Sequence, residues 1–214
     1  YYHSDQLYGS PKSPLMDGES TSLDLANHFE EMYKHLDGLD LGAPPEACIL
    51  ASEVVAQIES AVNRFFGAKA PEIYIDREIA SNAIAGRRRI RVRDTACFSD
   101  KDIDQLIYHE AYIHVATSIN GNNQEQLKIL GAAHPGTTKT QEGLAVFSEF
   151  ISGTIDLDRL RRLSDRIMAI QMAVDGADFI EVYNYYLGQI GSADQSFEST
   201  RRVFRGGVLT GGAP

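Results

Sequence analysis

Two histidines and a glutamate stand close together in the segment His109-Glu110-x-x-x-His114 of this chain of 214 residues. Imidazole is a common zinc ligand, and a glutamate beside it can take a proton from a zinc-bound water. The spacing is one residue longer than the H-E-x-x-H pattern of zinc proteases, whose histidines share one helix face. On a regular helix, five steps of about 100° would leave the two rings roughly 140° apart. We therefore predict a π-bulge or kink within residues 109–114 that turns both rings to one side.

A catalytic zinc takes three protein ligands and leaves one position for water, so the two histidines need a third partner. The candidate is Glu142, in the first turn of the helix predicted over residues 139–152. The small residues Gly143 and Ala145 would let this helix approach the histidine helix closely. Two histidines and a glutamate are the ligands of thermolysin-like metallopeptidases, which favours amide hydrolysis with Glu110 moving the proton.

Two further polar residues near this pattern are interpreted as ordinary surface positions. Glu149 follows Glu142 on the same predicted helix and could orient a ligand histidine, but a solvated glutamate is the preferred interpretation. His134 could be a fourth ligand, but we expect it in a surface turn because a catalytic zinc needs an open position.

The hydrophobic periodicity predicts mostly helices beside a small sheet, an α+β class that is mostly α. Alternating residues predict strands over 72–76 and 89–93. Asp100 or Asp102 is expected to cap the helix that carries the histidines. The expected helices span residues 22–39, 45–66, 101–120, 139–152, 156–174, 177–190 and 195–204. We expect a single domain over residues 1–214, with residues 1–20 as a leading segment draped over it.

Five arginines fall within residues 87–93, although the chain carries a formal net charge of -10. In the predicted strand the arginines occupy one face, and Ile90 and Val92 occupy the other. A solvated strand face is the preferred interpretation. The alternative is a basic edge strand that pairs with an extended peptide or an acidic tail.

The composition disfavours several other classes of protein. With Lys+Arg 20 against Asp+Glu 30, binding to nucleic acid is not expected. No apolar run approaches the length of a membrane span. The two cysteines, Cys48 and Cys97, are expected to be buried small side chains of a reducing compartment, which favours a cytoplasmic location. There is no nucleophile elbow, P-loop or dinucleotide fingerprint.

Four separated motifs together resemble a known family. They are His109-Glu110-x-x-x-His114, Thr117-Ser118-Ile119-Asn120-Gly121, Thr140-Gln141-Glu142-Gly143-Leu144-Ala145 and Arg201-Arg202-Val203-Phe204-Arg205-Gly206-Gly207. In this order they are similar to the bacterial QEGLA-motif proteins, labelled as modulators of flavohaemoglobin expression. They are also similar to the eukaryotic microtubule-associated tyrosine carboxypeptidases, which remove a carboxy-terminal tyrosine from tubulin.

The resemblance implies zinc bound by His109, His114 and Glu142, with Glu110 as the catalytic glutamate. It implies a substrate that is the carboxy-terminal end of a peptide or protein. The family continues past the arginine-glycine motif with a segment beginning Phe-Thr-Lys-Asp, so we expect this chain to be a truncated form.

A carboxypeptidase must hold a free carboxylate, which an arginine fork can do through two hydrogen bonds. Arg205 is the first candidate for this role, and Arg202 is the second. A phenol of the tyrosine cluster could donate to the transition-state oxyanion, and Tyr185 is taken as the candidate beside Tyr183 and Tyr186.

The first hypothesis is therefore a zinc-dependent metallopeptidase of zincin-like fold with a distorted active-site helix. The alternative is a non-enzymatic regulator that influences flavohaemoglobin expression and uses the same helices as a binding surface.

Overall fold

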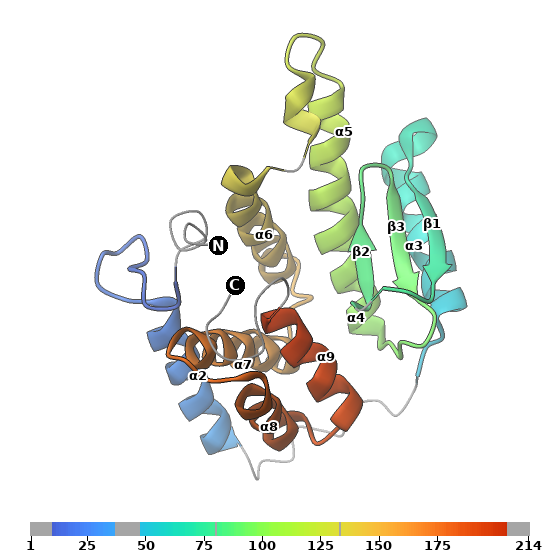
Figure 1. The fold of residues 1–214 in the computed structure, drawn as a ribbon. Helices are drawn as coiled ribbons and strands as arrows, with labels where there is room; N and C mark the ends of the chain where they lie inside the picture. The colour runs from blue at the N-terminus through green and yellow to red at the C-terminus, as the bar shows by residue number, and fades with distance from the viewer. Residues whose placement is uncertain (1–9, 37–47, 80, 133, 205–214) are drawn as a thin grey trace. The chain divides into compact units, whose positions relative to one another are not determined.

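The computed structural model of the chain describes residues 10–36, 48–79, 81–132 and 134–204. These residues are mostly helical and include a three-stranded sheet (Figure 1), so the predicted α+β class is confirmed. The chain divides into two compact units. The first joins the two ends of the chain, residues 1–41 and 157–214, and the second is its middle, residues 42–156. The single domain expected from the length stays a prediction.

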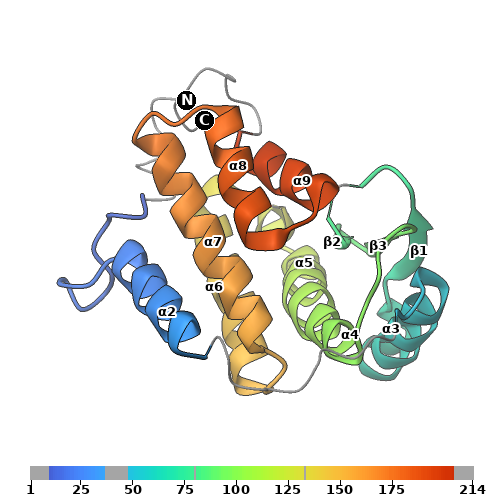
Figure 2. The same ribbon diagram turned by 90° about the horizontal axis from the view of Figure 1, so that it is seen from below.

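The first unit is built from helices α2 and α7–α9 (Figure 2). Helix α7 packs against α2 and α8, and its fully buried Ala169 and Ala173 share a core with Val182 of α8. The side chain of Thr21 accepts from the Asp24 backbone N–H, which caps the start of α2. The bounds are Ser22–Leu36 for α2, Leu157–Val174 for α7, Phe179–Ile190 for α8 and Ala193–Val203 for α9.

The predicted ends of these helices agree with the structure to within a few residues. The helix expected over residues 22–39 is described up to Leu36, and its remaining residues lie outside the described part of the chain. The leading segment is described from Ser10, and its Pro14 forms an isolated bridge with Thr21, just before α2.

The second unit contains a sheet of strands β1 (Glu72–Asp76), β2 (Ala83–Ala85) and β3 (Arg89–Arg93) in the order β1-β3-β2. Strand β3 is parallel to β1 and antiparallel to β2. The strands β1 and β3 confirm the prediction. The sequence did not predict β2, because three residues are too few for an alternation to be visible.

The basic strand β3 lies in the centre of this sheet, so the alternative of a basic edge strand is wrong. Its Ile90 and Val92 are fully buried, as the alternation predicted. On the other face, Arg91 Nη1 lies 3.2 Å from Asp76 Oδ2 of β1. Arg93 Nη2 donates to Asn82 Oδ1 at 3.2 Å. Arg91 and Arg93 therefore each have a polar partner close to the sheet.

Helix α3 (Ala51–Phe66) packs against β1 and β3 and shares their hydrophobic core. The prediction that this helix begins at residue 45 is wrong for residues 48–50, which are not helical. Ile49 instead forms a bridge with Phe98: its backbone N–H donates to the Phe98 carbonyl at 2.9 Å, and the reverse bond measures 3.3 Å. The residues before Cys48 in that prediction lie outside the described part.

A disulfide joins Cys48 to Cys97 next to this bridge, with 5.0 Å between their Cα atoms. Both cysteines are exposed. The expectation of two buried free thiols is therefore wrong, and a cytoplasmic location stays a prediction. In the described ranges no helix has the length and apolar character required to cross a bilayer.

One continuous helical rod runs past β2 as α4 (Asp100–Leu106), the π-helix η2 (Ile107–Val115) and α5 (Ala116–Asn122) (Figure 1). Its N-cap is Ser99, not Asp100 or Asp102 as expected. The Ser99 hydroxyl accepts from the Asp102 backbone at 3.2 Å, and the Asp102 carboxylate accepts from the Ser99 backbone at 2.9 Å. Asp102 therefore completes a capping box that Ser99 begins.

Helix α6 (Pro135–Ile151) follows the short 3₁₀ turn η3 (Lys128–Gly131), and a second such turn, η1 (Gly67–Lys69), follows α3. The exposed His134 is the N-cap of α6, where its Nδ1 accepts from the Gly136 backbone at 3.0 Å. This is the surface-turn role expected for His134.

We expect reduction of the Cys48–Cys97 disulfide to lower the free energy of unfolding. The bridge spans a sequence separation of 49 residues. A cross-link over a loop of this size reduces the conformational entropy of the unfolded chain, and losing it should lower the free energy of unfolding by about 4 kcal/mol. Urea unfolding with and without a dithiol measures the change. The double variant C48S/C97S should be as unstable as the reduced protein and insensitive to the dithiol, and an equal response of both proteins would contradict the prediction.

We expect Gly121→Ala to destabilise the second unit by about 1–3 kcal/mol, because the added methyl would overlap the backbone of Leu130 and Gly131. Gly143 of α6 is the matched control, since an added Cβ there meets nothing within 4 Å. Gly143→Ala should instead stabilise by about 0.5–1 kcal/mol through helix propensity. Urea unfolding distinguishes the two variants, and a loss of stability in both would contradict this account.

Candidate functional site

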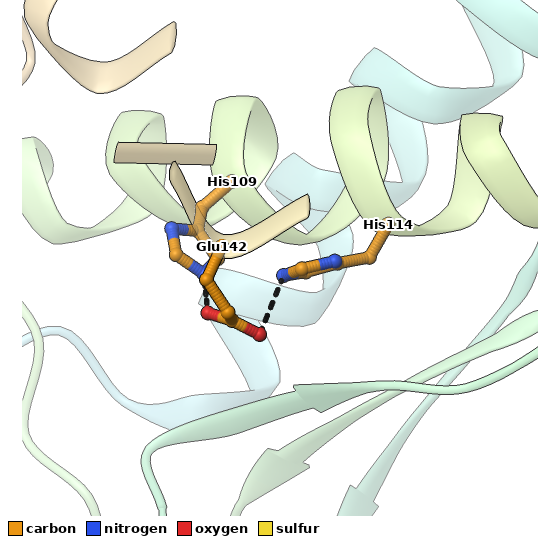
Figure 3. Close-up of side chains that lie close together, drawn as sticks. All are labelled: His109, His114 and Glu142. Atoms are coloured by element: carbon orange, nitrogen blue, oxygen red, sulfur yellow. Dashed lines mark ion pairs between the residues drawn. The ribbon is translucent and has the colours of Figure 1, made fainter. Parts of the chain in front are cut away.

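Three side chains of the second unit converge, His109 and His114 from η2 and Glu142 from α6 (Figure 3). His109 Nε2 lies 3.7 Å from Glu142 Oε2, and His114 Nε2 lies 3.5 Å from Glu142 Oε1. One nitrogen or oxygen atom of each side chain lies within 4.8 Å of the other two. The structure thus brings together the three residues that the sequence pointed to as ligands.

The π-helix η2 is the reason that residues five positions apart share one side. Its hydrogen bonds span five residues instead of four, so each turn is wider than in an α-helix. The ring centroids of His109 and His114 are 5.0 Å apart, with 68° between the ring planes. The predicted distortion of residues 109–114 is confirmed and extends over the whole of η2.

Helix α6 packs directly against η2, which places Glu142 beside the histidines. Ala145 is fully buried, and the Ser148 hydroxyl lies 3.3 Å from the Tyr108 carbonyl of η2, to which it donates. The expectation for Ala145 as a small residue at a close approach agrees with this burial. The same expectation for Gly143 is wrong, because its Cα faces open space.

Glu149 of α6 is not the solvated residue that the sequence analysis preferred, because its side chain is 0% exposed. Its Oε1 lies 2.6 Å from His109 Nδ1, and its Oε2 accepts from Gln105 Nε2 at 2.8 Å. A carboxylate on one ring nitrogen orients the other nitrogen and makes it a better metal ligand. Glu149 therefore has the orienting role that was the second interpretation.

Glu110 is the neighbour of His109 in η2, and its Oε2 accepts from the Ala85 backbone N–H at 2.9 Å. The strand β2 that the sequence did not reveal thus positions the candidate catalytic carboxylate. Burial raises the pKa of Glu110, and the nearby charges of His109 and His114 oppose this rise without cancelling it. A carboxyl with a raised pKa is suited to accept and return a proton.

The electrostatic potential at the site favours positive charge. Burial lowers the pKa of His109, but hydrogen bonds to Glu142 and Glu149 and the charge of Glu110 outweigh it and raise the pKa to about 9. Three carboxylates therefore surround two imidazoles. The same potential that holds a proton on His109 would attract a metal cation.

The residues proposed for substrate binding lie either in the first unit or outside the described residues. Arg205 lies outside the described residues. Arg202 of α9 and Tyr185 of α8 belong to the first unit, and their relation to the site stays a prediction. The Tyr185 hydroxyl donates to Asp165 Oδ1 at 3.2 Å, and burial raises the pKa of Tyr185 well above its usual value.

Gln105 is the residue that the sequence analysis missed. It lies one helical turn before His109, so the spacing of four places both on one side of the rod. The spacing of four residues could have pointed to Gln105, but glutamine is so common in helices that this spacing alone does not indicate a role.

Comparison with protein families matches residues 1–214 to the microtubule-associated tyrosine carboxypeptidase family. The chain belongs to this family, which relates it to carboxypeptidases and thus to hydrolases. Comparison with curated proteins gives no match. The narrower QEGLA-motif assignment stays a prediction.

We expect the stability of the metal-free protein to fall as the pH rises from about 6.5 to about 9. The pKa of His109 is raised from 6.5 to about 9 in the folded state, so its stabilisation is complete below pH 6.5 and is lost as the folded protein releases the proton. Urea unfolding in the presence of a chelator measures the effect. His109→Gln should remove this part of the pH dependence, whereas the control His28→Gln, at an exposed position, should retain it. If the free energy of unfolding depended on pH in the same way in both variants, His109 would not be the group responsible.

Proposed function

We propose that this chain is a zinc-dependent carboxypeptidase that removes the last residue of a peptide or protein. His109, His114 and Glu142 would hold the zinc, and Glu110 would move the proton. The observation that carries the proposal is the convergence of two imidazole nitrogens and a carboxylate beside a partly buried second glutamate, Glu110. The zincin-like fold is part of the proposal, supported by a ligand-bearing helix that runs beside a small sheet.

The donor set fits zinc in type and in dimension. Zinc binds nitrogen and oxygen at about 2.0–2.2 Å, so neighbouring ligand atoms of a tetrahedral site lie about 3.3–3.5 Å apart. The nitrogen-to-oxygen distances of 3.7 and 3.5 Å run to the two different oxygens of Glu142, and one ligand atom from each residue lies within 4.8 Å of the others, so the three side chains would draw together around the ion. The Glu142 side chain is 57% exposed, compared with 13% for His109, so the cluster is open on the Glu142 side. Water and a substrate carbonyl could approach from there.

Bound zinc would polarise the scissile carbonyl and lower the pKa of a water to about 7. The Glu110 carboxylate would accept a proton as the water oxygen bonds to the carbonyl carbon. It would return that proton to the amide nitrogen as the C–N bond breaks, which gives a new carboxylate and a free amino acid. The hydrogen bond from Ala85 holds the carboxylate in place for both transfers.

The family name supports tyrosine as the residue removed and a protein end as the substrate. An exopeptidase must recognise the free carboxylate of the last residue, and Arg205 and then Arg202 remain the candidates for this contact. Tyr185 remains the candidate donor to the oxyanion.

The test compares wild type, Glu110→Gln and Glu59→Gln, an exposed control on α3. Each is analysed for bound metal and incubated with peptides that differ in their last residue, including an amidated one. We expect about one zinc per chain in all three proteins. Wild type and Glu59→Gln should release single residues, tyrosine fastest, and leave the amidated peptide intact. Glu110→Gln should lose at least about 100-fold in rate.

Other outcomes have defined meanings. Zinc without any Glu110-dependent cleavage would favour the non-enzymatic regulator. Cleavage at internal bonds would contradict exopeptidase action. A wild-type protein that binds no zinc would contradict the metal centre itself.

A further inference from the structure

A buried row of polar side chains continues from His109 away from the ligand cluster, through Glu149 to Gln105. We infer that Gln105 is a positioning residue that sets the His109 ring by holding the Glu149 carboxylate. The part of this inference that concerns metal binding rests on the proposed function. The part that concerns the ring can be examined in the metal-free protein.

Glu149 lies between Gln105 and His109 and contacts both. Gln105 Nε2 donates to Glu149 Oε2 at 2.8 Å, and His109 Nδ1 lies 2.6 Å from Glu149 Oε1. The Glu149 side chain is fully buried, and Gln105 is only 9% exposed. The glutamine amide and the imidazole therefore approach the two different oxygens of one carboxylate.

The chemistry of the three groups makes the arrangement specific. A carboxylate only accepts hydrogen bonds, so the groups facing it must present N–H. The imidazole then carries a proton on Nδ1, which leaves Nε2 to face Glu142 and His114 as a metal ligand once its own proton is released. A rotation of the carboxylate would break this alignment. The amide of Gln105 opposes such a rotation because it binds the oxygen that His109 does not use.

The backbone carbonyl of Glu149 also accepts several hydrogen bonds. Its carbonyl accepts from the Thr154 backbone at 3.0 Å, from the Thr154 hydroxyl at 3.2 Å and from the Ile155 backbone at 3.2 Å. These bonds tie the end of α6 to the chain that follows it. The backbone position of Glu149 is therefore fixed, and the motion left to its carboxylate is a rotation of the side chain, which the hydrogen bond from Gln105 restricts.

The experiment is a double-mutant cycle of Gln105→Met and Glu149→Gln. Methionine keeps the length of glutamine and removes the N–H donors, whereas Glu149→Gln keeps the shape and removes the charge. Gln124→Leu, at an exposed position, is the matched control. Two quantities are measured for each protein: zinc affinity by competition with a chelator, and solvent exchange of the His109 Nδ1 proton by NMR in metal-free protein.

We expect Glu149→Gln to weaken zinc binding by about 10–100-fold and Gln105→Met by about 5–10-fold. The double variant should bind zinc no more weakly than Glu149→Gln alone, because Gln105 acts through the carboxylate. The His109 proton should exchange faster in Gln105→Met than in wild type, and Gln124→Leu should match wild type in both measurements.

Additive losses in the double variant would show that Gln105 contributes only packing and would overturn the inference. Unchanged affinity and exchange in Gln105→Met would do the same. If wild type bound no zinc, the proposed function would fail, while the exchange measurement would still decide the role of Gln105. If Gln105→Met did not fold, slow exchange of the His109 proton in wild type would support the inference, and fast exchange would overturn it.

Discussion

The widened turn of η2 is the constraint on which the candidate site depends. In a regular helix His109 and His114 would point in different directions, and no single carboxylate could lie against both rings. The π-helix places the ring centroids 5.0 Å apart. Such turns are rare, so packing on both sides must stabilise this one. Ala111 and Val115 of η2 are fully buried in the core shared with α3 and the sheet, and α6 covers another side of the same turn.

Charge explains why these side chains remain together. Glu110, Glu142 and Glu149 approach two imidazoles in a partly buried space, which would be unfavourable without compensating positive charge. In the metal-free protein a proton on His109 supplies part of it, as the raised pKa of that residue indicates. A divalent cation would supply more. The three carboxylates also differ in their surroundings: Glu149 is fully buried, Glu110 accepts a backbone hydrogen bond, and Glu142 is the most open of them.

The remaining elements of the second unit hold this rod in place. The capping box of Ser99 and Asp102 fixes where the helix begins, directly after Phe98, which is buried in the core. The Cys48–Cys97 disulfide and the Ile49–Phe98 bridge tie the same point to the start of α3. On the other side, the short strand β2 reaches Glu110 through the Ala85 backbone. The site is thus held by the two helices that carry it and by the edge of the sheet.

The sequence by itself predicted the two strands with alternating residues, most helices and the need for a distorted turn between His109 and His114, because periodicity and spacing are local properties of the chain. It pointed to Glu142 as their partner through the motif that contains this residue and not through local spacing. Only the tertiary structure decided what depends on contacts between distant segments. Glu149 looked solvated until α6 packed on η2 and buried it. The basic strand could have been an edge until β2 paired with it, and the two cysteines became partners only when α3 and β3 met. In each case the deciding quantity is a distance in space, which residue types and their spacing along the chain do not contain.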